Sequence, residues 1–300
     1  MEQLEAGAAD EKPLWRRIVD FPLVAMLIGI AVIVFGIFVA GAIAGHVLPD
    51  LPGFTTNMKF DLVCAPLLII LYKLIIRHLG EHKRDDLRLG GSLRPLGAGL
   101  GLGLALFAAV VAVAAVVGAY RVTGEGDLSG LPGALLGPAI FAAIAEEMLF
   151  RGVLFRWIEE FGGSWAALVI TAALFGAIHL ANPNASLVAA VGIALEAGLM
   201  LGAAYMLTRS LWLPMGIHAA WNFTQGEIFG VPVSGNHAHG LLVARLGGPA
   251  LLSGGPFGLE ASVIAVVVAT AAGVWLLVLA LRHGQLMQPR WVRRRAISAR

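Results

Sequence analysis

Eight long apolar stretches run through this 300-residue chain and constrain its fold more than any other feature. They lie at about residues 21–48, 60–76, 96–119, 135–157, 164–181, 186–207, 211–229 and 259–282. Most are close to the ~20 residues that a helix needs to cross the hydrocarbon core of a bilayer. Only 13% of the residues are charged, against the ~25% usual in soluble domains. The sequence therefore predicts an all-α membrane protein with about eight transmembrane helices.

The charges between these stretches predict its orientation. Cytoplasmic loops of membrane proteins are enriched in Lys and Arg. With a cytoplasmic N-terminus, the cytoplasmic segments contain all of the 21 basic residues except Lys59, Arg121 and Arg245. We therefore expect both termini in the cytoplasm. The first stretch is too long for the core of a signal peptide, which is roughly 7–15 residues, so we expect it to stay as a membrane helix.

The chain then divides into five segments, with no second, soluble domain. We expect a cytoplasmic N-terminal segment at 1–20, helices one to three within 21–134, a core of helices four to seven at 135–229, an extracytoplasmic Gly/Pro-rich loop at 230–258, and helix eight with a basic cytoplasmic tail at 259–300. The Ala-, Gly- and Arg-rich composition is typical of a bacterial protein. The expected location is therefore the bacterial inner membrane.

Small residues predict close packing between some of these helices. Glycines let helix backbones approach each other in a membrane, and the third and sixth stretches contain them at Gly97, Gly99, Gly101, Gly103, Gly198 and Gly202. The single cysteine, Cys64, lies in the second stretch, so the chain has no internal disulfide framework.

The fourth stretch carries two adjacent carboxylates, Glu146 and Glu147, in otherwise apolar sequence. A charge near the bilayer centre costs on the order of 2.5–3.5 kcal/mol even on the mildest scale, so such residues usually face a cavity or a partner. Residues four apart lie on one helix face, so Arg151 can neutralise Glu147. Glu146 points about 100° away from Glu147. We therefore expect Glu147 and Arg151 to be structural and Glu146 to be free for chemistry.

Two more stretches contain polar residues at helical spacing. Phe175 and His179 share one face of the fifth stretch, and His218 and Asn222 share one face of the seventh. Glu146 and His179 are almost equidistant from the predicted turn at 162–163, so antiparallel helices bring them to one depth. We expect a buried cluster, among helices four to seven, that water reaches from the cytoplasmic side. There Glu146 and His179 can polarise a water for attack on a peptide carbonyl, while His218 and Asn222 donate to the oxyanion.

These three pairs, Glu146-Glu147-x-x-x-Arg151, Phe175-x-x-x-His179 and His218-x-x-x-Asn222, resemble the signature of the CPBP family. That family comprises type II CAAX prenyl endopeptidases and Abi-like bacteriocin-processing and immunity proteins. The resemblance covers residues 141–222. It implies an intramembrane endopeptidase of eight helices, in which Glu146 and His179 activate water and His218 and Asn222 bind the oxyanion.

The family has been described both as metalloproteases and as metal-free glutamate proteases. This sequence lacks a His-Glu-x-x-His zinc helix, and we favour the metal-free reaction without a cofactor. The alternative is Zn²⁺ held by Glu146, His179 and His218 with an open water position.

Two non-proteolytic functions remain as alternatives. A non-catalytic membrane immunity or binding protein would use the same charges structurally, and a transporter would use Glu196 of the sixth stretch as a coupling residue. We expect a solvated loop, rather than a metal site, around His237 and His239. The expected partners are the lipid bilayer and a membrane-associated protein or peptide substrate, lipidated or not, and no nucleic acid.

Overall fold

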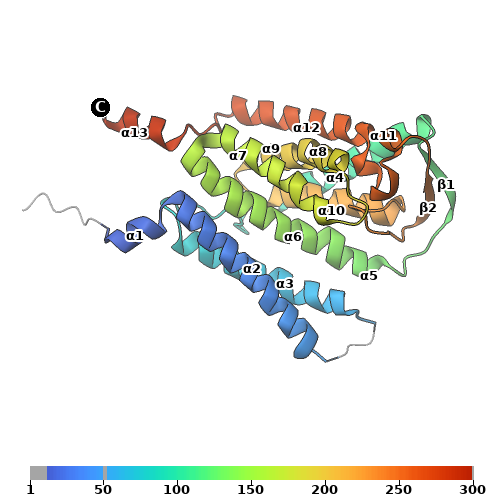
Figure 1. Cartoon of the computed structure of the whole chain (residues 1–300), viewed down its shortest axis with the longest axis horizontal. Helices are drawn as coiled ribbons and strands as arrows, with labels where there is room; N and C mark the ends of the chain where they lie inside the picture. The colour runs from blue at the N-terminus through green and yellow to red at the C-terminus, as the bar shows by residue number, and fades with distance from the viewer. Residues whose placement is uncertain (1–11, 50–52, 299–300) are drawn as a thin grey trace, which may run out of the picture.

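The computed structural model describes residues 12–49 and 53–298, which form a helical bundle with a two-stranded ribbon at one end (Figure 1). Residues 1–11 of the predicted N-terminal segment and Arg300 of the basic tail lie outside the described residues. The N-terminal part contains α1 (Leu14–Val19), α2 (Pro22–His46), α3 (Thr56–His78), α4 (Leu93–Val116) and β1 (Tyr120–Glu125).

The fourth and fifth apolar stretches form a run of helix that folds back on itself. It consists of α5 (Leu131–Ala134), the π-helix η1 (Leu135–Phe141), α6 (Ala142–Glu147), the π-helix η2 (Met148–Phe155), α7 (Arg156–Ile178) and the short 3₁₀-helix η3 (His179–Ala181). Gly163 interrupts α7 with φ 83° and ψ 169°. A Cβ atom there would lie 2.9 Å from the carbonyl oxygen of Met287, so this left-handed turn and its close approach both require glycine. The predicted turn at 162–163 is thereby confirmed.

The C-terminal part continues from the second arm of this hairpin into further helices. It contains α8 (Leu187–Ile193), the π-helix η4 (Ala194–Gly198), α9 (Leu199–Thr208), α10 (Trp212–Phe223), the π-helix η5 (Thr224–Ile228), β2 (Leu242–Leu246), α11 (Ala250–Ser253), the 3₁₀-helices η6 (Gly255–Phe257) and η7 (Leu259–Ala261), α12 (Val263–Arg282) and α13 (Arg290–Ser298). Residues 230–258 are therefore not a plain loop, because β2, α11 and η6 lie within them.

Helices of this length and composition make the chain an integral membrane protein. Within the described residues, five helical runs are long and apolar enough to span a bilayer: Pro22–His46, Leu93–Val116, Leu131–Ala181, Leu187–Thr208 and Val263–Arg282. The third of these contains the Gly163 turn, and α3 and α10 carry the two remaining apolar stretches. All eight stretches are therefore helical, while the count of eight spans and the cytoplasmic placement of both termini stay predictions.

The two ends of the bundle differ in the number of Lys and Arg residues that they carry. At the end that holds the Gly163 turn, α1 and α13, Arg16 donates to the carbonyl oxygen of His78 (2.6 Å) and Arg290 pairs with Glu81 (2.5 Å). We call this the basic end. At the other end β1 pairs antiparallel with β2, with a bulge between Val122 and Gly124. We call this the ribbon end, and it carries the three exceptional cations, Lys59 at the start of α3, Arg121 on β1 and Arg245 on β2.

A buried carboxylate, Asp20, lies among cations at the basic end. Lys12 and Arg16 approach its Oδ2 at 3.0 and 3.1 Å, and Lys83 approaches its Oδ1 at 3.7 Å. Burial disfavours the charged form of Asp20, but the hydrogen bond from Lys12 and the positive charges of Lys83 and Arg16 outweigh it and hold the pKa of Asp20 below its ordinary value. The ionised carboxylate therefore ties α1 to the segment after α3.

A second carboxylate at the basic end, Asp86, joins three parts of the chain. Its Oδ2 accepts hydrogen bonds from the hydroxyl of Tyr205 (2.6 Å) and from Nη1 of Arg156 (2.9 Å), while Nε of Arg84 donates to its Oδ1 (2.6 Å). The hydroxyl of Tyr72 lies 3.5 Å from the same Oδ2. Asp86 and Arg156 are both buried. Each needs the other's opposite charge, because a buried charge without a partner is strongly destabilising.

Helices α4 and α10 pack backbone to backbone through glycines. A Cβ atom on Gly99 would lie 2.4 Å from the carbonyl oxygen of Leu213, and one on Gly103 would lie 2.3 Å from that of Ile217. This contact confirms the predicted packing role for two of the four glycines in α4. Gly97 and Gly101 were predicted to pack in the same way, but a Cβ atom on either would meet nothing within 4 Å, because they lie on the opposite face of the helix. The tight contact fixes the position of α10, which carries His218.

Candidate active site

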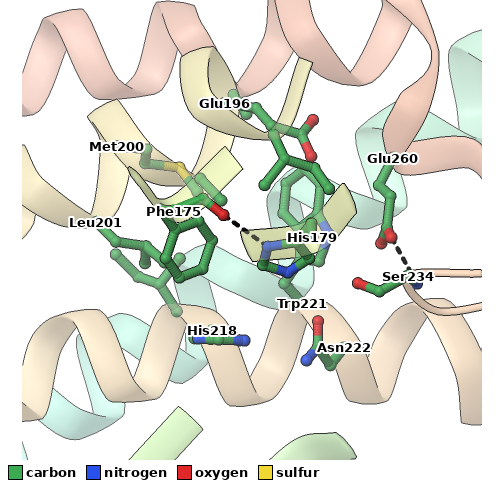
Figure 2. Close-up of a pocket in the computed structure, with 14 residues that line it drawn as sticks. Phe175, His179, Glu196, Met200, Leu201, His218, Trp221, Asn222, Ser234 and Glu260 are labelled. Atoms are coloured by element: carbon green, nitrogen blue, oxygen red, sulfur yellow. Dashed lines mark hydrogen bonds between the residues drawn. The ribbon is translucent and has the colours of Figure 1, made fainter. Parts of the chain in front are cut away.

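One cavity of about 570 Å³ is lined by all four side chains that the sequence predicted to be catalytic, namely Glu146, His179, His218 and Asn222. They come from α6, η3 and α10, which belong to the fourth, fifth and seventh apolar stretches. A second cavity of about 40 Å³ shares His179, His218 and Asn222 with the first (Figure 2). The structure therefore brings the three sequence motifs to one place among the predicted helices four to seven.

Glu147 and Arg151 form the ion pair that their spacing predicted, and His218 joins it. Nη1 of Arg151 lies 2.9 Å from Oε1 of Glu147, and both side chains are fully buried. Nδ1 of His218 lies 2.9 Å from the same oxygen. Arg151 also donates to the carbonyl oxygens of Ala197 (3.1 Å) and Gly198 (3.3 Å) on η4. Glu147 therefore orients His218 as well as neutralising Arg151, a contact across helices that the sequence did not reveal.

His179 is held by the backbone of its own helix. Its Nδ1 lies 2.7 Å from the carbonyl oxygen of Phe175. A carbonyl oxygen only accepts hydrogen bonds, so Nδ1 carries the proton and Nε2 of the neutral ring keeps its lone pair. The Phe175 ring lies between the two imidazoles, with centroids 4.9 Å from His179 and 6.3 Å from His218, and the Arg151 guanidinium lies 4.6 Å from its centroid. Phe175 thereby packs both imidazoles in place.

Glu146 differs sharply from its neighbour Glu147. It is half-buried, and its Oε2 is a buried atom without a hydrogen-bond partner among the described residues. Glu146 also lines the large cavity, and no cation or imidazole of the described residues is hydrogen-bonded to this oxygen. The two adjacent carboxylates therefore have different surroundings, one engaged by a cation and an imidazole and the other open to the cavity.

Asn222 bridges α10 to the fourth stretch. Its Nδ2 donates to the carbonyl oxygen of Pro138 (2.8 Å), within η1. An amide nitrogen has two hydrogens, so one N–H of Asn222 remains for a ligand in the cavity.

Four π-helical segments surround the site. They are η1, η2, η4 and η5, and η2 contains Arg151 while η4 supplies the two carbonyl oxygens that Arg151 contacts. Such segments are rare and frequently occur at functional sites. Their wider turns change which residues share a helix face, and periodicity at 3.6 residues per turn could not predict them.

The small cavity contains two carboxylates that the catalytic motifs do not include. Glu196 on η4 is buried and its Oε2 has no hydrogen-bond partner among the described residues, while Glu260 on η7 accepts a hydrogen bond from the backbone N–H of Ser234 (2.5 Å). The sequence placed Glu196 in a membrane stretch and left its role open. Glu260 gave a weaker signal, because a single acid at the start of an apolar stretch is ordinary at a membrane interface. Figure 2 shows both side chains on the far side of His179 from His218.

The large cavity lies towards the ribbon end. Its walls include Gly130, Gly133 and Gly137 from the start of the fourth stretch and residues 236–239 from the segment before β2. Towards the basic end, Arg151, Phe155 and Trp157 are fully buried. The cavity therefore lies at the ribbon end and not at the basic end, while the side of the membrane that each end faces stays a prediction. Positions in the sequence predicted how deep each residue lies in the membrane. They did not predict at which end of the bundle packed side chains close the cavity.

The side chains that could bind a metal ion form no compact cluster among the described residues. No group of three or more His, Cys, Asp and Glu side chains in the described part of the chain is arranged to hold a metal ion. Nδ1 of His218 is engaged by Glu147 and Nδ1 of His179 by a backbone carbonyl, so Nε2 is the remaining nitrogen of each ring. Glu146, His179 and His218, the set predicted for Zn²⁺, line one cavity. His237 and His239 are exposed at the mouth of the same cavity.

Fold and site together define an integral membrane protein whose helical bundle encloses a cavity lined by a carboxylate and two imidazoles. Residues 129–224, which contain all three motifs, match the family model described as type II CAAX prenyl endopeptidase Rce1-like. This match supports assignment of residues 129–224 to the CPBP family of intramembrane proteases, and with it a CAAX-type endopeptidase activity. Comparisons with curated proteins and with solved structures found no match.

Proposed function

We propose that this protein is an intramembrane endopeptidase that hydrolyses a peptide bond of a membrane-associated protein or peptide, using a water activated by Glu146 and His179. The observation that carries the proposal is Glu146 itself, a half-buried carboxylate that no described residue engages at Oε2 and that lines one cavity with both imidazoles and Asn222. A buried carboxylate beside a water is suited to act as a general base. The family match at residues 129–224 supports the same reaction class.

In the proposed reaction Glu146 and Nε2 of His179 both accept hydrogen bonds from the attacking water. Glu146 takes one proton as the water oxygen bonds to the peptide carbonyl carbon, and the carbonyl electron pair moves to its oxygen. The free N–H of Asn222 and Nε2–H of protonated His218 donate to this oxyanion. Glu146 then gives its proton to the amide nitrogen, the C–N bond breaks, and the amine and the acid leave.

The other side chains position these groups. Glu147 holds the His218 ring through Nδ1, so that Nε2 is the atom left for the cavity. The carbonyl of Phe175 holds the His179 ring in the tautomer that a water-binding role requires. No step needs a metal ion or another cofactor, and we propose a metal-free reaction.

The test compares membrane-associated peptide fragments in cells that produce the wild-type protein or the Glu146→Gln variant. We expect specific fragments with the wild type and their loss with Glu146→Gln, His179→Ala and His218→Ala. The matched control is Glu125→Gln, because Glu125 is an exposed carboxylate on β1, and its fragments should equal those of the wild type. Retained fragments with Glu146→Gln would overturn the assignment. If the cellular phenotype that the wild-type protein confers, such as immunity, persists with all three substitutions, a non-catalytic binding or immunity protein is favoured.

Metal dependence is tested separately on the purified protein. We expect no stoichiometric zinc by elemental analysis and unchanged cleavage after treatment with a chelator. Loss of cleavage that is restored by added Zn²⁺ would contradict the metal-free reaction while leaving the endopeptidase assignment intact.

A further inference from the structure

The position of the cavity, combined with the distribution of charge, determines the side of the membrane from which substrate arrives. The four candidate catalytic side chains lie in a cavity whose wall continues to the ribbon end, along Gly130 and Gly133 on one side and residues 236–239 on the other. Asn236 and His237 on this wall are exposed. The path from Glu146 to solvent therefore leads out beside the ribbon.

The path towards the basic end is filled. Directly below the site the Glu147–Arg151 pair is fully buried, and the next turns place Phe155 and Trp157 in the core without exposed surface. Further along, Asp86 and its partners join the segment after α3 to the start of α7. Water and a polypeptide cannot reach Glu146 from this end without unpacking the bundle.

Charge then assigns the two ends to the two sides of the membrane. The basic end gathers α1, the segment 79–92, the Gly163 turn and α13. Among the described Lys and Arg residues, only Lys59, Arg121 and Arg245 lie at the ribbon end. Because Lys and Arg in short loops are retained in the cytoplasm, this asymmetry places the basic end in the cytoplasm and the ribbon end outside it.

We infer that the site opens on the extracytoplasmic face and that its substrates are polypeptide segments exposed on that face, such as exported peptides or outer loops of membrane proteins. The inference rests on the proposed endopeptidase function for its substrate class, although the side of access follows from geometry and charge alone.

The lone cysteine permits a direct test of the side of access. Cys64 is buried in α3, and a Cys64→Ala background leaves no thiol in the chain. Three single-cysteine variants are then made in it. Ser234→Cys reports on the cavity wall, Ser129→Cys on the exposed ribbon end, and Ser92→Cys on the basic end, where the Ser92 side chain caps no hydrogen bond.

Intact bacterial spheroplasts that produce each variant are treated with a membrane-impermeant maleimide. We expect labelling of Ser234→Cys and Ser129→Cys, and labelling of Ser92→Cys only in inside-out vesicles or after lysis. A Ser234→Cys variant labelled in inside-out vesicles but not in spheroplasts would overturn the inference, and so would one labelled from neither side. Membrane extraction of each variant at wild-type yield confirms insertion.

The same labelling is repeated with Glu146→Gln added, which separates this inference from the proposed function. Labelling from outside in both backgrounds supports the access side whether or not the protein cleaves peptides. In the fragment comparison, peptides lost with Glu146→Gln should map to extracytoplasmic segments. Fragments that map to cytoplasmic segments would contradict the substrate class even where the protease activity is confirmed.

Discussion

The two adjacent glutamates should respond oppositely when each is changed to glutamine. Glu147 lies at 0% exposure between a fully buried Arg151 and His218. Glu147→Gln removes the carboxylate that is hydrogen-bonded to the buried Arg151 guanidinium, and breaking a buried ion pair in this way costs about 3–5 kcal/mol. Glu146 is half-buried and one of its carboxylate oxygens has no partner, so Glu146→Gln should change the free energy of unfolding by less than about 1 kcal/mol.

The assay is denaturant unfolding of the purified protein in detergent micelles, followed by tryptophan fluorescence, with peptide cleavage measured in parallel. Glu146→Gln should lose cleavage with wild-type stability, and Glu147→Gln should lose both. A double variant, Glu147→Gln with Arg151→Met, should recover part of the lost stability, because replacing both partners of a buried pair is often close to neutral.

This reasoning fails if Glu147→Gln unfolds within about 1 kcal/mol of the wild type, since the pair would then contribute no more than an exposed one. It also fails if Glu146→Gln is the less stable of the two single variants. Either result would mean that the structural role has been assigned to the wrong one of the two glutamates.

Three further outcomes follow from contacts described above. Gly103→Leu should lower stability by about 1–3 kcal/mol, since a side chain there collides with the backbone of α10, whereas Gly101→Leu, which faces open space, should be neutral in the same unfolding assay. Asn222→Ala should lower the cleavage rate about 10²–10³-fold as an oxyanion donor is lost, with unfolding little changed; a rate within threefold of wild type would exclude the donor role. Asp20→Asn should be less stable than wild type at pH 7. Because the pKa of Asp20 is lower in the folded protein, that difference should be full above the unfolded pKa of about 3.9 and disappear as the pH falls further through the folded pKa; a difference that is constant from pH 7 to pH 3 would contradict it.

The sequence predicted the helices of this fold well, because each apolar stretch carries its own signal of length and composition. The Gly163 turn was also predictable, since it lies between two such stretches. The ribbon was not predicted. Its strands, β1 and β2, pair residues more than 100 positions apart, such as Tyr120 with Leu246. The alternation of apolar and polar residues that marks a half-buried strand covers only the first four residues of β1 and is missing from β2.

The sequence predicted which residues line the candidate site, but only some of the hydrogen bonds and ion pairs between them. Helical spacing identified Arg151 as a partner of Glu147, because both lie on one helix. The contact between Glu147 and His218 crosses from one helix to another, and no periodicity within a single stretch can reveal it. The end of the bundle at which the cavity lies could not be predicted for a related reason, since it depends on how side chains such as Trp157 pack between helices.

The segment that matches the protease family depends on contacts with residues outside it. Arg156 lies inside the matched residues, but its neutralising carboxylate, Asp86, lies outside them. The same holds for Tyr72, whose ring packs so closely on Gly152 that a methyl group there would come within 2.5 Å of it. Grafting this catalytic unit onto another scaffold, or expressing it as a minimal fragment, would require transferring α3 and the segment 79–92 as well.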